Sequence, residues 1–111
     1  MARAVFVNNV PIRLTEERWF HIIRHHEELQ PLQREVTLTV STPDALYLSS
    51  PSIKPNYAAV KIFRKLREMG LAENLVVHYR EVSPSDGFIL TALVISPERL
   101  ARRFRRWQRL R

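Results

Sequence analysis

Two strand-forming runs joined by a tight turn constrain the fold of this chain more than any other feature. Leu75–Val82 and Phe88–Ile95 are the clearest β runs, and the sequence Pro84-Ser85-Asp86-Gly87 between them is a turn signal. We therefore expect the two runs to pair as an antiparallel hairpin.

Two further strands are predicted upstream of this hairpin. Ala4–Asn8 is apolar and β-branched, and Asn9 and Pro11 are expected to end it. Val36–Val40 alternates apolar residues with threonine, which is typical of a half-buried strand. A turn-rich connection is expected around Pro43, Ser49–Ser52 and Pro55.

A helix is predicted between these two strands. Thr15 is a suitable N-cap, and Glu16 and Glu17 follow in the first turn, where the helix dipole favours acidic side chains. The apolar period continues to about Leu29, and Pro31 is expected to stop the helix.

The segment 57–69 supports two interpretations. Ala58, Ala59 and a possible cap at Gly70 favour a helix. The alternation of Val60 and Ile62 with charged residues permits a strand instead.

Length and composition indicate one small domain without covalent or metal supports. The chain has 111 residues and no cysteine, which excludes a disulfide scaffold, a thiolate nucleophile and sulfur-ligated metal sites. No apolar run is long enough to cross a bilayer and no signal peptide is evident, so we expect a cytoplasmic protein. The predicted architecture is a single α+β domain over 1–111, an antiparallel sheet of about four strands with an N-terminal helix packed on it and a basic C-terminal helix.

Positive charge is concentrated at the C-terminus. The net charge of the chain is +7, and residues 97–111 contain seven arginines and one glutamate, a local charge of +6. Ser96 and Pro97 predict a helix start, and Leu100, Phe104 and Trp107 form an apolar stripe along a helix over 97–111. Such a basic face is the electrostatic footprint of nucleic-acid binding, although solvated arginines on a docked helix are the alternative. The candidate nucleic-acid-binding residues are Arg99, Arg102, Arg103, Arg105, Arg106 and Arg109.

Three of the four histidines fall in the first helix. On a helical wheel His26 lies within the apolar face, whereas His21 and His25 point away from it. The i, i+4 spacing of His21 and His25 suits two ligands of one metal, but a pair of exposed histidines explains it as well, and we expect no metal site and no cofactor. His26 is either a core histidine or a proton-transfer group at the edge of the sheet.

The first helix also carries a resemblance to a known group of proteins. Residues 14–19 (LTEERW), followed by 21–23 (HII), His26 and Glu28, resemble the opening motif of phage and bacterial nuclease-like domains grouped with barnase, EndoU, colicin and RelE. Further short matches follow in the same order over residues 12–95. They are Thr37-Leu38 with Pro43-Asp44, Phe63-Arg64, Val76-Val77, Asp86-Gly87-Phe88-Ile89 and Thr91-Ala92.

The resemblance implies metal-independent cleavage of RNA by attack of the ribose 2′-hydroxyl on the adjacent phosphodiester. It places the family histidine at His26, the strand threonine at Thr91 and the aromatic–arginine pair at Phe63 and Arg64, and it favours a strand over Val60–Lys65. The chain departs from the family in having His25-His26-Glu27-Glu28 in place of Arg-His-Pro-Glu and in having Phe63 where tyrosine is frequent. The full set of candidate catalytic residues is His26, Arg64, Thr91, Lys61 and His78, in which His26 and His78 would move protons and the others would bind phosphate.

Three classes of function follow from these observations. The chain is predicted to be an endoribonuclease of this kind, either a toxin or a nuclease associated with a phage or mobile element. The alternative is an inactive RNA- or DNA-binding module that uses the arginine segment. A third class is an oligomerisation or partner-binding protein, such as a homodimer or a protein with an antitoxin-like partner, and no membrane association is expected.

Overall fold

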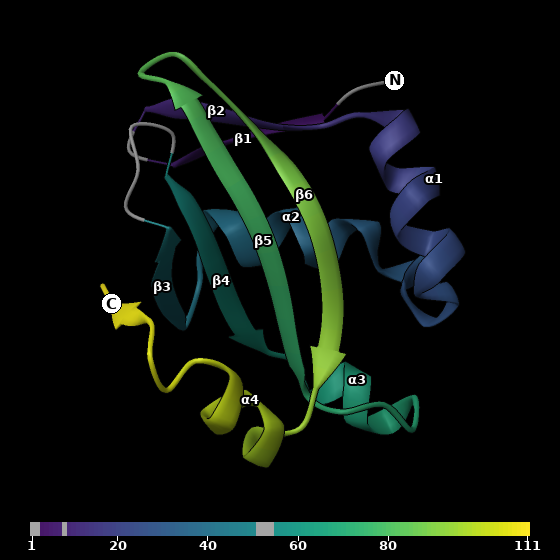
Figure 1. The fold of residues 1–111 in the computed structure, drawn as a ribbon. Coiled ribbons are helices and arrows are strands. Elements are labelled where there is room, and N and C mark those ends of the chain that lie inside the picture. The colour runs from purple at the N-terminus through teal and green to yellow at the C-terminus, as the bar shows by residue number, and fades with distance from the viewer. Residues whose placement is uncertain (1–2, 8, 51–54) are drawn as a thin grey trace.

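The computed structural model describes residues 3–7, 9–50 and 55–111 (Figure 1). These residues form seven strands, four α-helices and one 3-10 helix. In chain order the elements are β1 (Arg3–Val7), β2 (Val10–Leu14), α1 (Glu16–His25), η1 (Glu27–Leu32), α2 (Gln33–Ser41), β3 (Ala45–Ser50), β4 (Asn56–Ile62), α3 (Arg64–Glu68), β5 (Asn74–Ser83), β6 (Asp86–Ile95), α4 (Pro97–Arg103) and β7 (Gln108–Arg109). The prediction of an α+β fold is confirmed.

The strands form one mixed sheet in the order β1-β2-β6-β5-β4-β3-β7. The predicted hairpin of β5 and β6 is confirmed and lies inside this sheet. β2 and β6 run parallel where Ile12 and Arg13 pair with Gly87 and Phe88, and the other neighbouring strands are antiparallel. The prediction of an antiparallel sheet of about four strands is therefore wrong in both strand number and direction.

Two residues expected to end the first strand instead lead into a second one. Asn9 has φ of 69°, a left-handed conformation that asparagine tolerates, and β2 then pairs antiparallel with β1. Pro11 lies just before the two residues that pair with β6, so its missing N–H does not interrupt that contact. Asn8, the last residue of the predicted first strand, lies outside the described residues, and so do Pro51 and Ser52 of the predicted turn-rich connection.

Val36–Val40 belongs to helix α2 and is not a strand. Val36 and Val40 are four residues apart and both are buried in the main core, which is the spacing of one helix face. The hydroxyls of Thr37 and Thr39 donate to the carbonyls of Arg34 and Glu35 at 2.9 and 2.8 Å. The threonines thus satisfy their polar groups on the preceding turn, which the alternating pattern did not reveal.

The first helix begins as predicted but ends earlier. The Thr15 hydroxyl accepts a hydrogen bond from the Arg18 amide at 3.2 Å, so the predicted N-cap is confirmed. α1 ends at His25, and the chain continues as the 3-10 helix η1, which contains Pro31. Proline lacks the N–H that an α-helix needs and crowds the carbonyl four residues before it, which accounts for the tighter turn.

Both interpretations of the segment 57–69 hold, each for a different part. Residues up to Ile62 form strand β4, and Arg64–Glu68 form helix α3. The predicted strand over Val60–Lys65 is therefore right only to Ile62. Gly70 follows the helix with φ of 78° and donates its amide to the Arg67 carbonyl, as a helix C-terminus requires.

The sheet separates two apolar cores. α1, η1 and α2 cover one face, and Figure 1 shows α2 passing behind the strands. α4 and the residues after it cover part of the other face, where Phe104 packs against Val60, Val76 and Ile95. Consecutive residues of β5 alternate between the cores, with Val77 in the larger and Val76 in the smaller.

The predicted C-terminal helix over 97–111 is shorter than expected. The Ser96 hydroxyl caps α4 by accepting from the Arg99 amide at 3.3 Å, but the helix ends at Arg103. β7 pairs with β3 through Tyr47↔Arg109 and Leu48↔Gln108. The free edge of β3 offers unpaired backbone groups, and hydrogen bonding to this edge draws the last residues away from a helical path.

Candidate nucleic-acid interface

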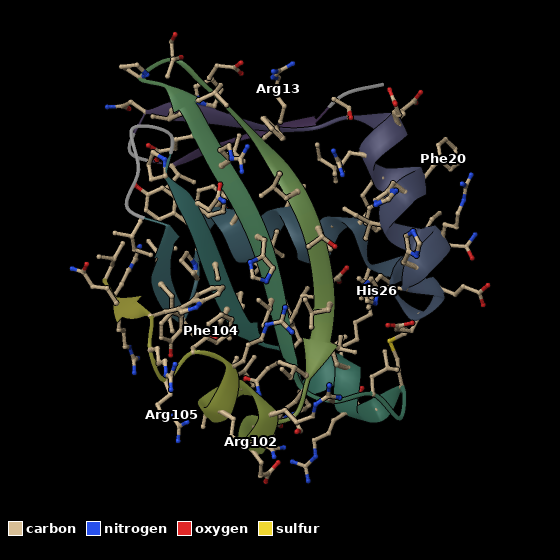
Figure 2. The ribbon with its side chains drawn as sticks, viewed as in Figure 1. Arg13, Phe20, His26, Arg102, Phe104 and Arg105 are labelled. Atoms are coloured by element: carbon tan, nitrogen blue, oxygen red, sulfur yellow. The ribbon has the colours of Figure 1, made fainter. Side chains whose placement is uncertain are left out.

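Three of the predicted nucleic-acid-binding arginines border one hollow. Arg99, Arg102 and Arg103, all exposed, line a depression of about 350 Å³ together with the buried Ile95. They lie on the outer side of α4, because Leu100 and Phe104 turn the other side towards the sheet. Figure 2 shows Arg102 pointing away from the strands and Phe104 lying against them.

These arginines have no acidic partners among the described residues. Within the described part of the chain, Arg99, Arg102, Arg103, Arg105 and Arg106 form no ion pair with a carboxylate. Arg109 differs from them, since its Nε donates to the Arg111 carbonyl at 3.0 Å. We call the five residues Arg99, Arg102, Arg103, Arg105 and Arg106 the arginine surface.

His78 and Thr91, two of the predicted catalytic residues, lie beside this surface. They are direct partners in the β5–β6 pairing and face the α4 side of the sheet. The His78 ring lies 5.8 Å from Trp107 and 6.4 Å from Phe104, measured between ring centroids. Its Nε2 is buried without a hydrogen-bond partner among the described residues. Burial, and secondarily the charge of Arg103, lower the pKa of His78 to about 4, so the ring is neutral at pH 7.

His26 lies on the opposite side of the sheet from Thr91. It is the C-cap residue of α1, with φ of −139°, and its Nδ1 is 3.7 Å from a Glu28 carboxylate oxygen. Because the helix ends at His25, the helical wheel does not fix the direction of His26, and its side chain is partly exposed. In Figure 2 it lies below the end of α1, far from Phe104 and the labelled arginines.

The remaining predicted catalytic residues do not join either histidine. The Lys61 ammonium donates to the Thr42 carbonyl at 2.6 Å and lies 3.8 Å from the Asp44 carboxylate, so it ties β4 to the end of α2. Arg64 is the exposed first residue of α3. Of the five candidates, the structure brings together only His78 and Thr91.

A cleft between α1 and β6 contains ionisable residues that the sequence analysis did not select. Its volume is about 410 Å³. The Arg13 guanidinium is already engaged with Asp86 through two hydrogen bonds of 2.9 and 3.0 Å, and Arg18 donates to the Leu90 carbonyl at 3.4 Å. The arginines of the cleft are therefore less available to bind a polyanion than those of the arginine surface. The lining residues are Arg13, Thr15, Glu17, Arg18, His21, Phe88 and Ile89.

A second pocket lies beneath α4, on the side away from the arginine hollow. It has a volume of about 350 Å³ and a mostly apolar lining that includes Ile62, Leu100 and Phe104. The apolar stripe of the C-terminal segment predicts that one side of α4 packs against the sheet. The pocket itself could not be predicted from that stripe, because residues of β3, β4 and the start of β5 also line it. We call it the α4 pocket, and its lining residues are Tyr47, Ile62, Glu73, Asn74, Pro97, Leu100, Ala101 and Phe104.

Two other features are absent from the described ranges 3–7, 9–50 and 55–111. No group of three or more His, Cys, Asp or Glu side chains there is arranged to hold a metal ion. No helix in the same ranges is long and apolar enough to span a membrane.

Comparisons of the chain with protein-family models, with curated proteins and with solved structures find no match. Only the geometry and charge of the chain itself therefore bear on its function.

Proposed function

We propose that the protein binds single-stranded RNA through the arginine surface. The observation that carries this proposal is the meeting of Arg99, Arg102 and Arg103 at one hollow, with no carboxylate paired to them in the described residues. Clustered like charges repel one another, and a bound phosphate backbone relieves that repulsion.

The chemistry of arginine suits this role. A guanidinium presents a planar fork of donors that matches two phosphate oxygens, and it stays protonated at any physiological pH. α4 has seven residues and a length of about 10 Å, so it reaches a short stretch of backbone. A flexible single strand follows such a small curved surface more easily than a stiff duplex does.

The anchoring of α4 adds to the argument. Phe104 is 4 % exposed and stacks on Tyr47 with 4.7 Å between ring centroids. The arginines are therefore held on a fixed base, which reduces the ordering cost of binding.

A charge-matched pair of variants tests the proposal. Arg99→Gln/Arg102→Gln/Arg103→Gln is expected to weaken binding of a fluorescent 12-nucleotide RNA at least about tenfold in an anisotropy titration. Arg24→Gln/Arg34→Gln/Arg67→Gln removes the same charge from exposed positions on α1, α2 and α3 and should weaken it far less. Equal losses in the two variants would mean that net charge, and not the arginine surface, governs binding.

Catalysis is not part of the proposal. The predicted ribonuclease reaction needs a base, an acid and phosphate-binding cations at one cleft, and of the five candidate residues only His78 and Thr91 lie together. Ribonuclease activity stays a prediction of the sequence.

A further inference from the structure

The α4 pocket has the composition of a ligand site. Ile62, Leu100 and Ala101 supply apolar walls, and Glu73 and Asn74 place a carboxylate and an amide beside them. Its volume of about 350 Å³ and its few polar groups among apolar ones are typical of pockets that hold a flat organic ligand.

One polar side chain in the lining of the pocket is largely buried. Asn74 is 3 % exposed, lies on the α4 side of β5 two residues before Val76, and lines the pocket. A side-chain amide carries both donors and an acceptor, so Asn74 can hydrogen-bond to a ligand in the pocket.

One apolar residue in the wall of the α4 pocket is largely exposed to solvent. Ile62 ends β4 on the face that α4 covers, yet it is 56 % exposed. An isoleucine that borders a pocket in this way gains burial when a flat ligand covers it.

We propose that the α4 pocket takes one unpaired guanine base of the RNA that the arginine surface binds. This inference rests on the proposed function, since the RNA strand would run from the arginine surface on the outer side of α4 to the pocket beneath the helix. Arg102 and Arg103 follow Ala101 directly, and Arg105 follows Phe104, so phosphate-binding and pocket-lining positions alternate along the same few residues. Figure 2 shows Arg105 directed outward next to the inward Phe104.

The polar groups favour guanine over the other bases. A carboxylate only accepts hydrogen bonds, and guanine is the one base that presents two neighbouring donors, its N1–H and its 2-amino group. Uracil, cytosine and adenine place an acceptor next to their donor on the same edge, and that acceptor would face the Glu73 carboxylate unfavourably. The Asn74 amide provides a donor for the guanine carbonyl oxygen.

The test compares two RNA oligonucleotides, nine uridines and the same strand with a single central guanosine. The wild type should bind the guanosine strand about tenfold more tightly. Glu73→Gln should reduce this ratio to near one, because the amide presents a donor next to its acceptor. Ala101→Phe, which fills the pocket from an exposed helix position, should also abolish the ratio.

The failure of this inference differs from the failure of the proposed function. Equal wild-type affinities for the two strands, or a preference that survives both variants, would overturn the pocket assignment and leave the arginine surface intact. If neither strand binds, the proposed function falls, and the pocket is judged by titration with GMP and UMP in NMR. A shift of the Asn74 side-chain NH₂ signal by GMP but not by UMP would still support it, and no shift would overturn it.

Discussion

The imidazole of His78 lies edge-on to the indole of Trp107, with 5.8 Å between ring centroids and 74° between ring planes. The contact joins the middle of the sheet to the segment that follows α4. It shields a ring whose Nε2 has no partner among the described residues, and this burial lowers the pKa of His78 to about 4. Protonation of this one residue is therefore coupled to the packing of the C-terminal segment.

Acidification should destabilise the protein through His78. The unfolded chain takes up the proton near pH 6.5, whereas the folded chain takes it up near pH 4, so the unfolding free energy falls as the pH drops between these values. The loss should approach about 3 kcal/mol near pH 4. Urea denaturation at pH 7 and at pH 4.5 measures it.

Two histidine variants separate this effect from general acid destabilisation. His78→Phe should remove most of the stability difference between the two pH values. His25→Gln, at an exposed position on α1, should leave the difference as it is. The same pH dependence in all three proteins would show that other groups titrate in this range.

Phe104 is expected to be the main anchor of α4. Phe104→Ala removes the stack on Tyr47 and the edge contact with Trp107 and leaves a cavity, which should cost about 3–4 kcal/mol. Phe20→Ala removes the same side chain from a position that is 60 % exposed and should change stability by less than about 0.5 kcal/mol. Thermal unfolding followed by circular dichroism compares them, and equal shifts in Tm would contradict the anchoring role.

The salt dependence of RNA binding provides a second measure of the arginine surface. Each arginine that neutralises a phosphate of a single strand adds about 0.7 to the slope of log K against log salt. Arg99→Gln/Arg102→Gln/Arg103→Gln should therefore lower the magnitude of the slope by about 2. Deleting residues 99–111 would be a poorer test, since it also removes Phe104 from the core. An unchanged slope in the triple variant would mean that these arginines do not contact phosphate.

The sequence predicted the elements whose signals are local. The β5–β6 hairpin, the Thr15 cap and the start of α4 each follow from neighbouring residues, and all three are present. Val36–Val40 was misassigned because valine and threonine favour strands intrinsically, while burial of one helix face overrides that preference here.

The candidate site, too, could be predicted from the sequence only where its signal is local. The concentration of arginine was visible in the sequence, whereas the hollow that three of the arginines share depends on how α4 packs. The α1–β6 cleft depends on a pairing of Arg13 with Asp86, 73 positions apart, which no local pattern indicates. His26 was placed by extending a regular helix one residue past its actual end.

RNA is expected to survive incubation with the protein in EDTA. His26 lies 3.7 Å from Glu28 on one side of the sheet, and Thr91 and His78 lie on the other side, so these candidate residues do not converge on one phosphodiester. Gel analysis of a labelled RNA should show no cleavage by the wild type above that of His26→Ala. Cleavage by the wild type that His26→Ala abolishes would support the ribonuclease prediction.

The two glycines should respond differently to alanine. Gly87 pairs with Ile12 where β2 and β6 run parallel, and an added Cβ would lie 2.6 Å from Ile12 Cδ1 and 2.7 Å from the Arg80 carbonyl oxygen. The isoleucine tip can move, but the carbonyl belongs to the β5–β6 ladder, so Gly87→Ala should cost about 3 kcal/mol. Gly70 has no atom within 4 Å of an added Cβ, and Gly70→Ala should cost only the strain of its positive φ, about 1 kcal/mol. Chemical denaturation measures both, and a Gly87→Ala protein as stable as Gly70→Ala would mean that β2 and β6 are not in this close parallel contact.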